Sequence, residues 1–302
     1  MIHNAAMKIQ SLIFSLLLSG QVMAGTNVIY GQDNRRDIFQ ETSSKLLEIS
    51  ESVAGLVHKK DINVILNTSS RRIFRDQPTM KMMCEEEKFI EQRVLPRCTG
   101  FLVDKNKILT ASHCVANSKD CQDYKWVFDF EMEDEINLSK NFLRQKNVYT
   151  CTKVLDQGFK IGLEYILIEL DRSVSDRLPL ELSTDEVDPQ EELVTIGHPS
   201  GLPLKVIDEG FIKKIQNNVY YVNLDSYKGN SGAPVIAKNS GKIIGMISAG
   251  KADFYFDANN DCFRSNKCDE NGENCSVESK VEMEKVISAK AISEAISSQI
   301  RR

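Results

Sequence analysis

The sequence predicts an all-β fold, either a sandwich or a barrel, with one helix at the C-terminal end. From about residue 52 onward, short runs rich in Val, Ile, Leu and aromatic residues alternate with turn signals. Most of these runs have the length of a strand, and helical segments do not alternate with them, which argues against an α/β fold. The expected strands are residues 53–57, 100–103, 107–110, 165–170, 193–196, 219–224, 233–236 and 243–247.

Three other segments differ in composition. Residues 280–300 repeat apolar side chains at helical spacing, which predicts the C-terminal helix. Residues 176–190 contain two prolines and several acids and are the best linker candidate. We therefore expect an N-terminal lobe at 25–178 and a C-terminal lobe at 179–302. Residues 80–91 are highly charged and predict a surface insertion or a short helix.

The first 24 residues have the pattern of a secretory signal peptide. Lys8 supplies the positive charge, residues 9–18 are largely apolar, and residues 22–24 (Val-Met-Ala) offer a cleavage site with small residues. The apolar stretch is too short to span a bilayer, which takes about 20 residues. We expect an exported protein, secreted or periplasmic, that no longer contacts a membrane once the signal is removed.

Eight cysteines, an even number, fit disulfides in an oxidising compartment. A zinc site is disfavoured because no histidine lies near the last three cysteines. Asp257, Asn259 and Asp261 have the spacing of a calcium loop, but cysteines stand where its glycine and its final glutamate belong. We therefore expect a disulfide-pinned surface loop, no metal and no cofactor.

The net charge of −5 is mild, and no run of Lys and Arg stands out. These features disfavour binding to nucleic acid or to an anionic membrane surface. We expect a monomer.

The first candidate for chemistry is Ser231, in the run Gly-Asn-Ser-Gly-Ala-Pro that begins at Gly229. A serine hydroxyl needs a base to take its proton, and attack on a carbonyl needs donors for the oxygen that becomes negative. Flanking glycines let the amides of Gly229 and Ser231 point into one small space as an oxyanion hole. An ordinary tight turn is the alternative explanation of this run.

His113 is the second candidate, in the run Thr-Ala-Ser-His-Cys. His58 and His198 are the other histidines that could serve as a base, and His198 stands in a turn where a loop role suffices. Cys98 precedes Cys114 by sixteen residues, so that a Cys98–Cys114 bridge would hold the imidazole across a hairpin. A buried structural histidine is the alternative.

Together these runs resemble the chymotrypsin/trypsin family of serine peptidases, most closely its bacterial trypsin-like and glutamyl-endopeptidase branches. The resemblance covers about residues 50–250 and depends on the order and separation of the two runs, with support from residues 197–201 and 53–57. It implies two packed six-stranded antiparallel β-barrels. It also implies a serine endopeptidase that forms an acyl-enzyme on Ser231 with His113 as the base, and a protein or peptide as partner.

The family's third catalytic residue is an aspartate, and here the matching position holds Glu164. This acid orients the histidine and stabilises the imidazolium. Glutamate can do so, although its extra methylene requires a shifted backbone or a bent rotamer. Asp156 is the alternative acid, and Glu164 as a plain surface charge is the competing explanation.

Substrate preference follows from the same resemblance. Asp225, six residues before Ser231, corresponds to the acid that pairs with Arg or Lys at the base of the pocket. Ser248 and Gly250 correspond to the pocket wall that pairs with the substrate backbone. We therefore expect cleavage after Arg or Lys, with glutamyl preference as one alternative and a catalytically silent binding protein as the other. Val28-Ile29 resembles the family's activated amino terminus, but Asn230 stands where its partner acid belongs.

Overall fold

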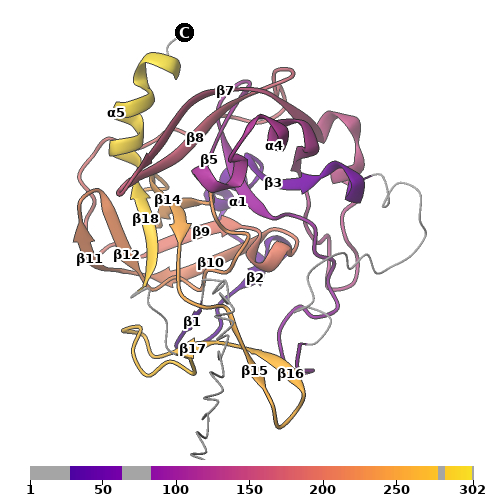
Figure 1. The fold of residues 1–302 in the computed structure, drawn as a ribbon, viewed down its shortest axis with the longest axis vertical. Coiled ribbons are helices and arrows are strands. Elements are labelled where there is room, and N and C mark those ends of the chain that lie inside the picture. Colours follow the sequence, from indigo (N-terminus) through magenta and orange to yellow (C-terminus); the bar gives the residue numbers. More distant parts are fainter. Residues whose placement is uncertain (1–27, 63–82, 278–282, 301–302) are drawn as a thin grey trace, which may run out of the picture.

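The structure is a computed structural model that describes residues 28–62, 83–277 and 283–300. The expected signal peptide at 1–24 lies outside these residues. Within the described part, no helix is long and apolar enough to span a bilayer. Two β-structured lobes pack together, and a helix stands at the C-terminal end (Figure 1). The all-β prediction with a C-terminal helix is confirmed.

The first lobe is a closed barrel of six strands. Its interior is filled by large apolar side chains such as Trp126, Leu102 and Phe128, which are fully buried. The β-strand alternation and the burial of these residues explain why the runs found in the sequence form strands here. In barrel order the strands are β3 (Val53–His58), β4 (Cys98–Asp104), β5 (Lys107–Thr110), β8 (Leu163–Leu170), β7 (Val148–Lys160) and β6 (Tyr124–Phe128).

The second lobe is an eight-stranded sheet whose order closes no barrel among the described residues. Seven of its strands, all except β2, contribute apolar side chains to a common core, and β2 and β11 form the edges of the sheet. In sheet order the strands are β11 (Ile212–Gln216), β12 (Val219–Val222), β18 (Glu284–Ser288), β14 (Ile243–Ala249), β13 (Pro234–Ala237), β9 (Leu193–Gly197), β10 (Lys205–Gly210) and β2 (Arg36–Asp37).

The C-terminal helix α5 (Ala289–Ile300) is shorter than the expected span of 280–300. Residues 284–288 instead form strand β18, which pairs with β12 on one side and β14 on the other. The helical spacing of apolar residues misled the prediction, because two neighbouring strands supply backbone hydrogen bonds that outweigh local propensity. Met283 precedes this strand, and positions 280–282 of the expected helix lie outside the described residues.

The N-terminal segment joins the second lobe although it precedes the first. Strand β1 (Ile29–Tyr30) pairs with β17 (Lys267–Cys268), and β2 pairs with β10. The Lys205 ammonium, fully buried, lies 2.5 Å from the Asp37 carboxylate. Burial lowers the pKa of Lys205 to about 8, and the nearby Asp37 opposes that change. A buried pair of this kind fixes the segment in one place, since removing either partner leaves an uncompensated charge.

Disulfides fasten the remaining loops. The predicted Cys98–Cys114 bridge is present, and the other six cysteines pair as well. Residues 83–91 contain no helix. The Cys84–Cys262 disulfide ties them to the hairpin of β15 (Phe254–Asp257) and β16 (Cys262–Ser265), so the surface-insertion alternative holds for this part. The remaining bridges are Cys121–Cys151 and Cys268–Cys275.

Candidate active site

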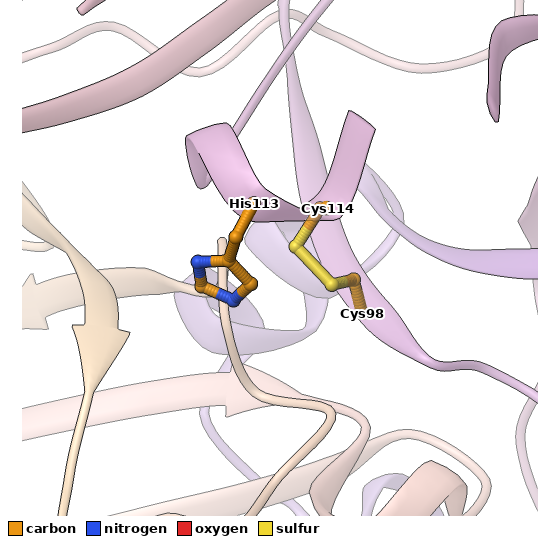
Figure 2. Close-up of side chains that lie close together, drawn as sticks. All are labelled: Cys98, His113 and Cys114. Carbon is orange, nitrogen blue, oxygen red and sulfur yellow. A yellow bond between two sulfur atoms is a disulfide. The ribbon is translucent and has the colours of Figure 1, made fainter. Parts of the chain in front are cut away.

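His113 follows strand β5 in the short 3₁₀ turn Ser112–Val115. Its neighbour Cys114 is fully buried and bonded to Cys98 at the start of β4, so the turn is tied to the barrel wall on one side. Figure 2 shows the imidazole and the disulfide projecting from this turn side by side. The imidazole remains exposed to solvent. The sequence therefore places a histidine ring at the edge of the first barrel with little freedom at its base.

Ser231 lies in a tight turn just before strand β13. Gly229 has φ +108° and Gly232 has φ +89°, both in the region that favours glycine. Within the turn, the Asn230 N–H donates to the Tyr227 carbonyl at 2.9 Å and the Ala233 N–H to the Asn230 carbonyl at 2.8 Å. These bonds and the two glycines with positive φ fix the backbone on both sides of Ser231.

The two turns are joined by backbone contacts between the lobes. The Thr99 N–H donates to the Ser231 carbonyl at 2.9 Å, and the Thr99 hydroxyl donates to the Gly229 carbonyl at 2.7 Å. The Sγ of Cys114 lies 3.6 Å from the same Ser231 carbonyl. A Cβ at Gly232 would lie 2.0 Å from the Thr99 carbonyl oxygen, so only glycine permits this approach. The structure thus brings the His113 and Ser231 turns together.

No hydrogen bond joins the His113 ring to the Ser231 hydroxyl within the described part of the chain. Catalytic hydrogen bonds are often long in enzymes without substrate and shorten when it binds. The amide N–H groups of Gly229 and Ser231 also have no intramolecular acceptor among the described residues. Two neighbouring amides left unpaired are what an oxyanion hole requires.

Of the two candidate acids, Glu164 is the one whose charge acts on the His113 ring. The Glu164 charge acts on the His113 ring and raises its pKa, and the Glu164 carboxylate accepts the Ser248 hydroxyl at 2.7 Å. Asp156 instead accepts the Tyr165 hydroxyl at 2.8 Å on the β7–β8 hairpin. The Ser248 bond orients Glu164 from the second lobe, so all three candidate catalytic side chains lie where the lobes meet.

The net effect of the surroundings is to lower the pKa of His113 below its usual 6.5. Loss of hydration is the main cause, Glu164 opposes it, and the Arg97 guanidinium adds to it. Arg97 is held close by, since its guanidinium donates to the Cys114 carbonyl at 2.7 Å. A lowered pKa keeps the imidazole neutral at pH 7, which is the form that can accept a proton.

The other two histidines lie elsewhere. His58 ends strand β3, where its Nδ1 accepts the Lys60 N–H. His198 is 1% exposed, its Nδ1 donates to the Leu202 carbonyl at 3.0 Å, and burial lowers its pKa to about 3. His198 is thus a neutral structural residue that shapes the loop beneath Gly229, because a Cβ on Gly229 would lie 2.3 Å from its carbonyl oxygen.

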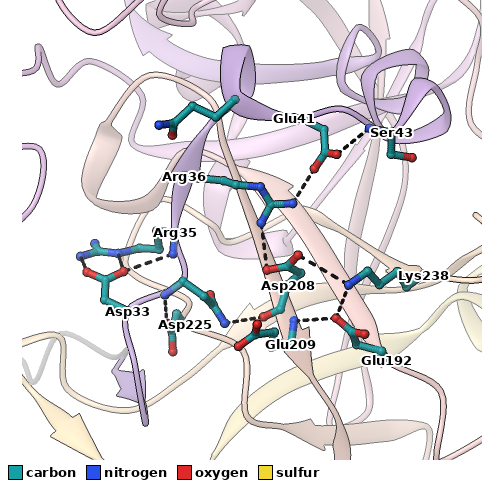
Figure 3. A network of polar contacts seen from close by, with 12 residues as sticks. Asp33, Arg35, Arg36, Glu41, Ser43, Glu192, Asp208, Glu209, Asp225 and Lys238 are labelled. Atoms are coloured by element: carbon teal, nitrogen blue, oxygen red, sulfur yellow. Dashed lines mark hydrogen bonds and ion pairs between the residues drawn. The ribbon is translucent and has the colours of Figure 1, made fainter.

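Asp225 is 1% exposed, and both of its carboxylate oxygens accept amides of the N-terminal segment. Oδ1 accepts the Tyr30 N–H at 2.7 Å and Oδ2 the Asn34 N–H at 3.1 Å. Figure 3 shows Asp225 lying against this segment, next to the Asp33–Arg35 pair. The expected role of Asp225 toward substrate stays a prediction, and the structure adds a contact that the sequence had not suggested. Ser248 lies near the end of β14, which pairs with β18, and Gly250 directly follows this strand.

Sequence reasoning missed several residues that build this site. Thr99 connects the two turns, and Gly232 permits their close approach. The glycine after Ser231 was a usable signal, whereas nothing distinguished Thr99 from any other strand threonine. Glu284 was also missed, since it lay inside the expected helix.

Comparisons with known proteins agree with this geometry. Residues 98–246 match the family model of the trypsin-like peptidase domain, so the chain contains such a domain. A comparison with curated proteins finds no match.

Solved structures resemble the whole chain in fold. The active form of the Rv3671c protease from M. tuberculosis is 13% identical with a TM-score of 0.50, over 97% of this chain and 93% of that one. A Glu endopeptidase in complex with MPD is 14% identical with a TM-score of 0.50, over 91% and 100%. The serine endoprotease from Yersinia pestis is 12% identical with a TM-score of 0.50, over 86% and 68%. At these identities the likeness concerns the fold alone.

Proposed function

We propose that this chain, which contains a trypsin-like peptidase domain, is an exported serine endopeptidase that cleaves peptide bonds through an acyl-enzyme. The observation that carries the proposal is the junction of the His113 and Ser231 turns through Thr99 and Gly232. This junction supports assigning Ser231 as the nucleophile, His113 as the base and Glu164 as the acid, with the unpaired amides of Gly229 and Ser231 as the oxyanion hole. Such an arrangement serves acyl transfer.

In the proposed reaction the Ser231 oxygen attacks the peptide carbonyl while His113 takes its proton. The C–N bond then breaks, and His113 gives the proton to the leaving amine. The amides of Gly229 and Ser231 donate to the oxygen that becomes negative in each tetrahedral state. Water, deprotonated by His113, hydrolyses the acyl-enzyme and frees Ser231. Glu164 holds the ring and stabilises the imidazolium.

We further propose cleavage after Arg or Lys. Support comes from three buried acids. Asp225 precedes Ser231, Asp253 follows β14, and Glu284 lies on β18, which pairs with β14. Ser248 and Gly250 would present the backbone of β14 to the substrate chain. Export is supported by the four disulfides, which fit an extracellular or periplasmic protein.

The test compares the full chain with its Ser231→Ala variant on a mixed peptide library. We expect wild-type cleavage to vanish in the variant. Equal cleavage by both proteins would refute the proposal. A wild-type protein that neither cuts peptides nor reacts with a fluorophosphonate at Ser231 would instead favour a silent binding protein on this fold, for which the unformed His113–Ser231 hydrogen bond is the motivating observation.

A further inference from the structure

Three carboxylic side chains are buried together behind the segment that leads to Ser231. Asp225 is 1% exposed, Asp253 is 6% exposed and Glu284 is 0% exposed. Burial raises the pKa of Asp225 to about 7 and that of Asp253 to about 8. Burial also raises the pKa of Glu284 well above its usual range, and the charges of Asp253 and Asp225 add to the effect. The buried Arg35 guanidinium opposes this effect at Asp225 and Asp253, whereas at Glu284 the two neighbouring acids add to the cost of burying a charge.

The cluster lies between the two segments that flank the expected substrate site. The Gly232 N–H donates to the Ile247 carbonyl at 2.7 Å, and the Lys228 N–H donates to the two Asp253 carboxylate oxygens at 3.3 and 3.4 Å. Glu284 reaches the same place from β18, where its Oε1 accepts the Lys251 N–H at 3.1 Å. The segment before Ser231 and the segment after Ser248 therefore enclose these acids.

The three acids differ in their capacity to accept another donor. Asp225 has both oxygens occupied by the amides of Tyr30 and Asn34. Asp253 has both oxygens on the Lys228 N–H. Glu284 uses only Oε1, which takes the Lys251 amide and, at 3.4 Å, the Tyr30 hydroxyl.

The Oε2 of Glu284 is buried without a hydrogen-bond partner among the described residues, and so is the hydroxyl oxygen of the fully buried Ser226. Within the described part of the chain the Oδ1 of Asn34, whose amide bonds to Asp225, is unpaired as well. A buried polar atom without a partner is costly, so Glu284 is the one acid of the three with an oxygen that has no donor there. An ammonium or guanidinium group brings several N–H donors and a positive charge, and such a group can bond to the unpaired Oε2 of Glu284.

We propose that Glu284, rather than Asp225, pairs with the cationic side chain of the substrate residue before the scissile bond. Asp225 then serves to fasten the N-terminal segment beneath the site. The inference rests on the proposed function, because the substrate side chain can reach Glu284 only when the peptide carbonyl beside it is bound at Ser231. It assigns substrate selection to a residue of β18, far along the chain from Ser231.

The experiment uses the full chain and four fluorogenic peptides that differ only in the residue before the scissile bond: Arg, Lys, Gln or Glu. Wild type, Glu284→Gln and Asp225→Asn are compared, with active sites counted by fluorophosphonate labelling of Ser231. We expect Glu284→Gln to lower kcat/KM for the Arg and Lys peptides by about 30-fold or more, because a buried charged partner is lost. Its rate on the Gln peptide and its labelling should stay close to wild type.

Asp225→Asn is the matched control, since it also removes one buried carboxylate charge. We expect it to keep the Arg-to-Gln selectivity ratio and to lower the thermal midpoint, because its amide replaces an acceptor of the N-terminal segment. This control also carries the test if Glu284→Gln does not fold. Selectivity retained in Asp225→Asn supports the inference, and selectivity lost there contradicts it.

Two further results would overturn the inference while the proposed function stands. One is a Glu284→Gln protein that labels normally and keeps its preference for Arg. The other is a wild-type protein that labels normally and cleaves best after Glu. A wild-type protein with no labelling at Ser231 would instead contradict the proposed function itself, so the two failures are distinguishable.

Discussion

The two flanks of Ser231 are held by different forces. Toward the first lobe, backbone groups meet directly, with the Thr99 N–H on the Ser231 carbonyl and Gly232 in contact with Thr99. Toward the second lobe, buried acids such as Asp225 and Asp253 fix the segment through amide donors. Backbone contacts do not titrate, whereas buried carboxyls do. The fold of the flank that faces the first lobe should therefore depend on close fit, and the stability of the flank that faces the second lobe should depend on pH.

The largest effect is expected from Gly232→Ala on the flank that faces the first lobe. The new Cβ would lie 2.0 Å from the Thr99 carbonyl oxygen, at a φ of +89°. We expect loss of activity and a fall of at least about 3 kcal/mol in the free energy of unfolding, measured by urea denaturation.

Gly241→Ala is its matched control. Gly241 also has a positive φ, +70°, but its Cβ would meet only the flexible side chain of Lys45. We expect activity to persist and stability to fall by about 1–2 kcal/mol. Equal losses in the two variants would show that the approach between the lobes is not what Gly232 provides.

Glu164→Gln should give the next largest effect. The carboxylate that acts on His113 loses its charge, so the imidazolium formed during attack is less stable. We expect kcat to fall on the order of 10³–10⁴-fold, as measured with a fluorogenic peptide. Asp156→Asn should stay near wild type, because Asp156 bonds to Tyr165 on the hairpin. A larger loss of kcat in Asp156→Asn than in Glu164→Gln would show that Asp156 is the acid that supports His113.

The pH profile gives a smaller but sharper test of the flank that faces the first lobe. Activity needs neutral His113, and the pKa of this imidazole is lowered, so kcat/KM should rise with pH and reach half its maximum below pH 6.5. Arg97 lowers this pKa and Glu164 raises it. Arg97→Gln should therefore move the midpoint to higher pH, and residual activity of Glu164→Gln should show it at lower pH. Shifts in the same direction would contradict this electrostatic account.

The smallest effect concerns stability on the flank that faces the second lobe. Burial raises the pKa of Asp253 to about 8, so the folded protein retains a proton there that the unfolded chain releases above about pH 4. This stabilising contribution is complete below pH 4 and is lost as pH rises through about 8. Between pH 6 and 8 we expect the free energy of unfolding of wild type to fall relative to that of Asp253→Asn, by roughly 1 kcal/mol per pH unit. If the free energies of unfolding of the two proteins changed with pH in parallel, Asp253 would not be the group that retains the proton.

The fold was readable from sequence where the signal was local. The run at 107–110 is a strand with those bounds, and the Cys98–Cys114 bridge forms. The helix predicted for residues 284–288 was wrong. Their apolar spacing fits a helix, and only the pairing with β12 and β14 makes them a strand. The runs around His113 and Ser231 are likewise local signals, and their catalytic role stays a prediction.

What the sequence could not supply was the pairing of distant groups. No pattern in the chain links Asp225 to the Tyr30 amide, 195 residues away, or Glu284 to the Lys251 amide. Both contacts exist because the N-terminal segment crosses to the second lobe and pairs with β17 and β10. Such long-range contacts depend on the assembled fold, and they determine which acids have an oxygen free.

The account depends above all on whether His113 activates Ser231. The most direct measurement is the rate at which a fluorophosphonate labels Ser231 in wild type and in His113→Ala, with intact mass and peptide mapping to locate the label. We predict rapid labelling of wild type at Ser231 alone, and labelling slowed by a factor on the order of 10³ or more in His113→Ala. Equal labelling rates in the two proteins, or a label on another residue, would contradict it.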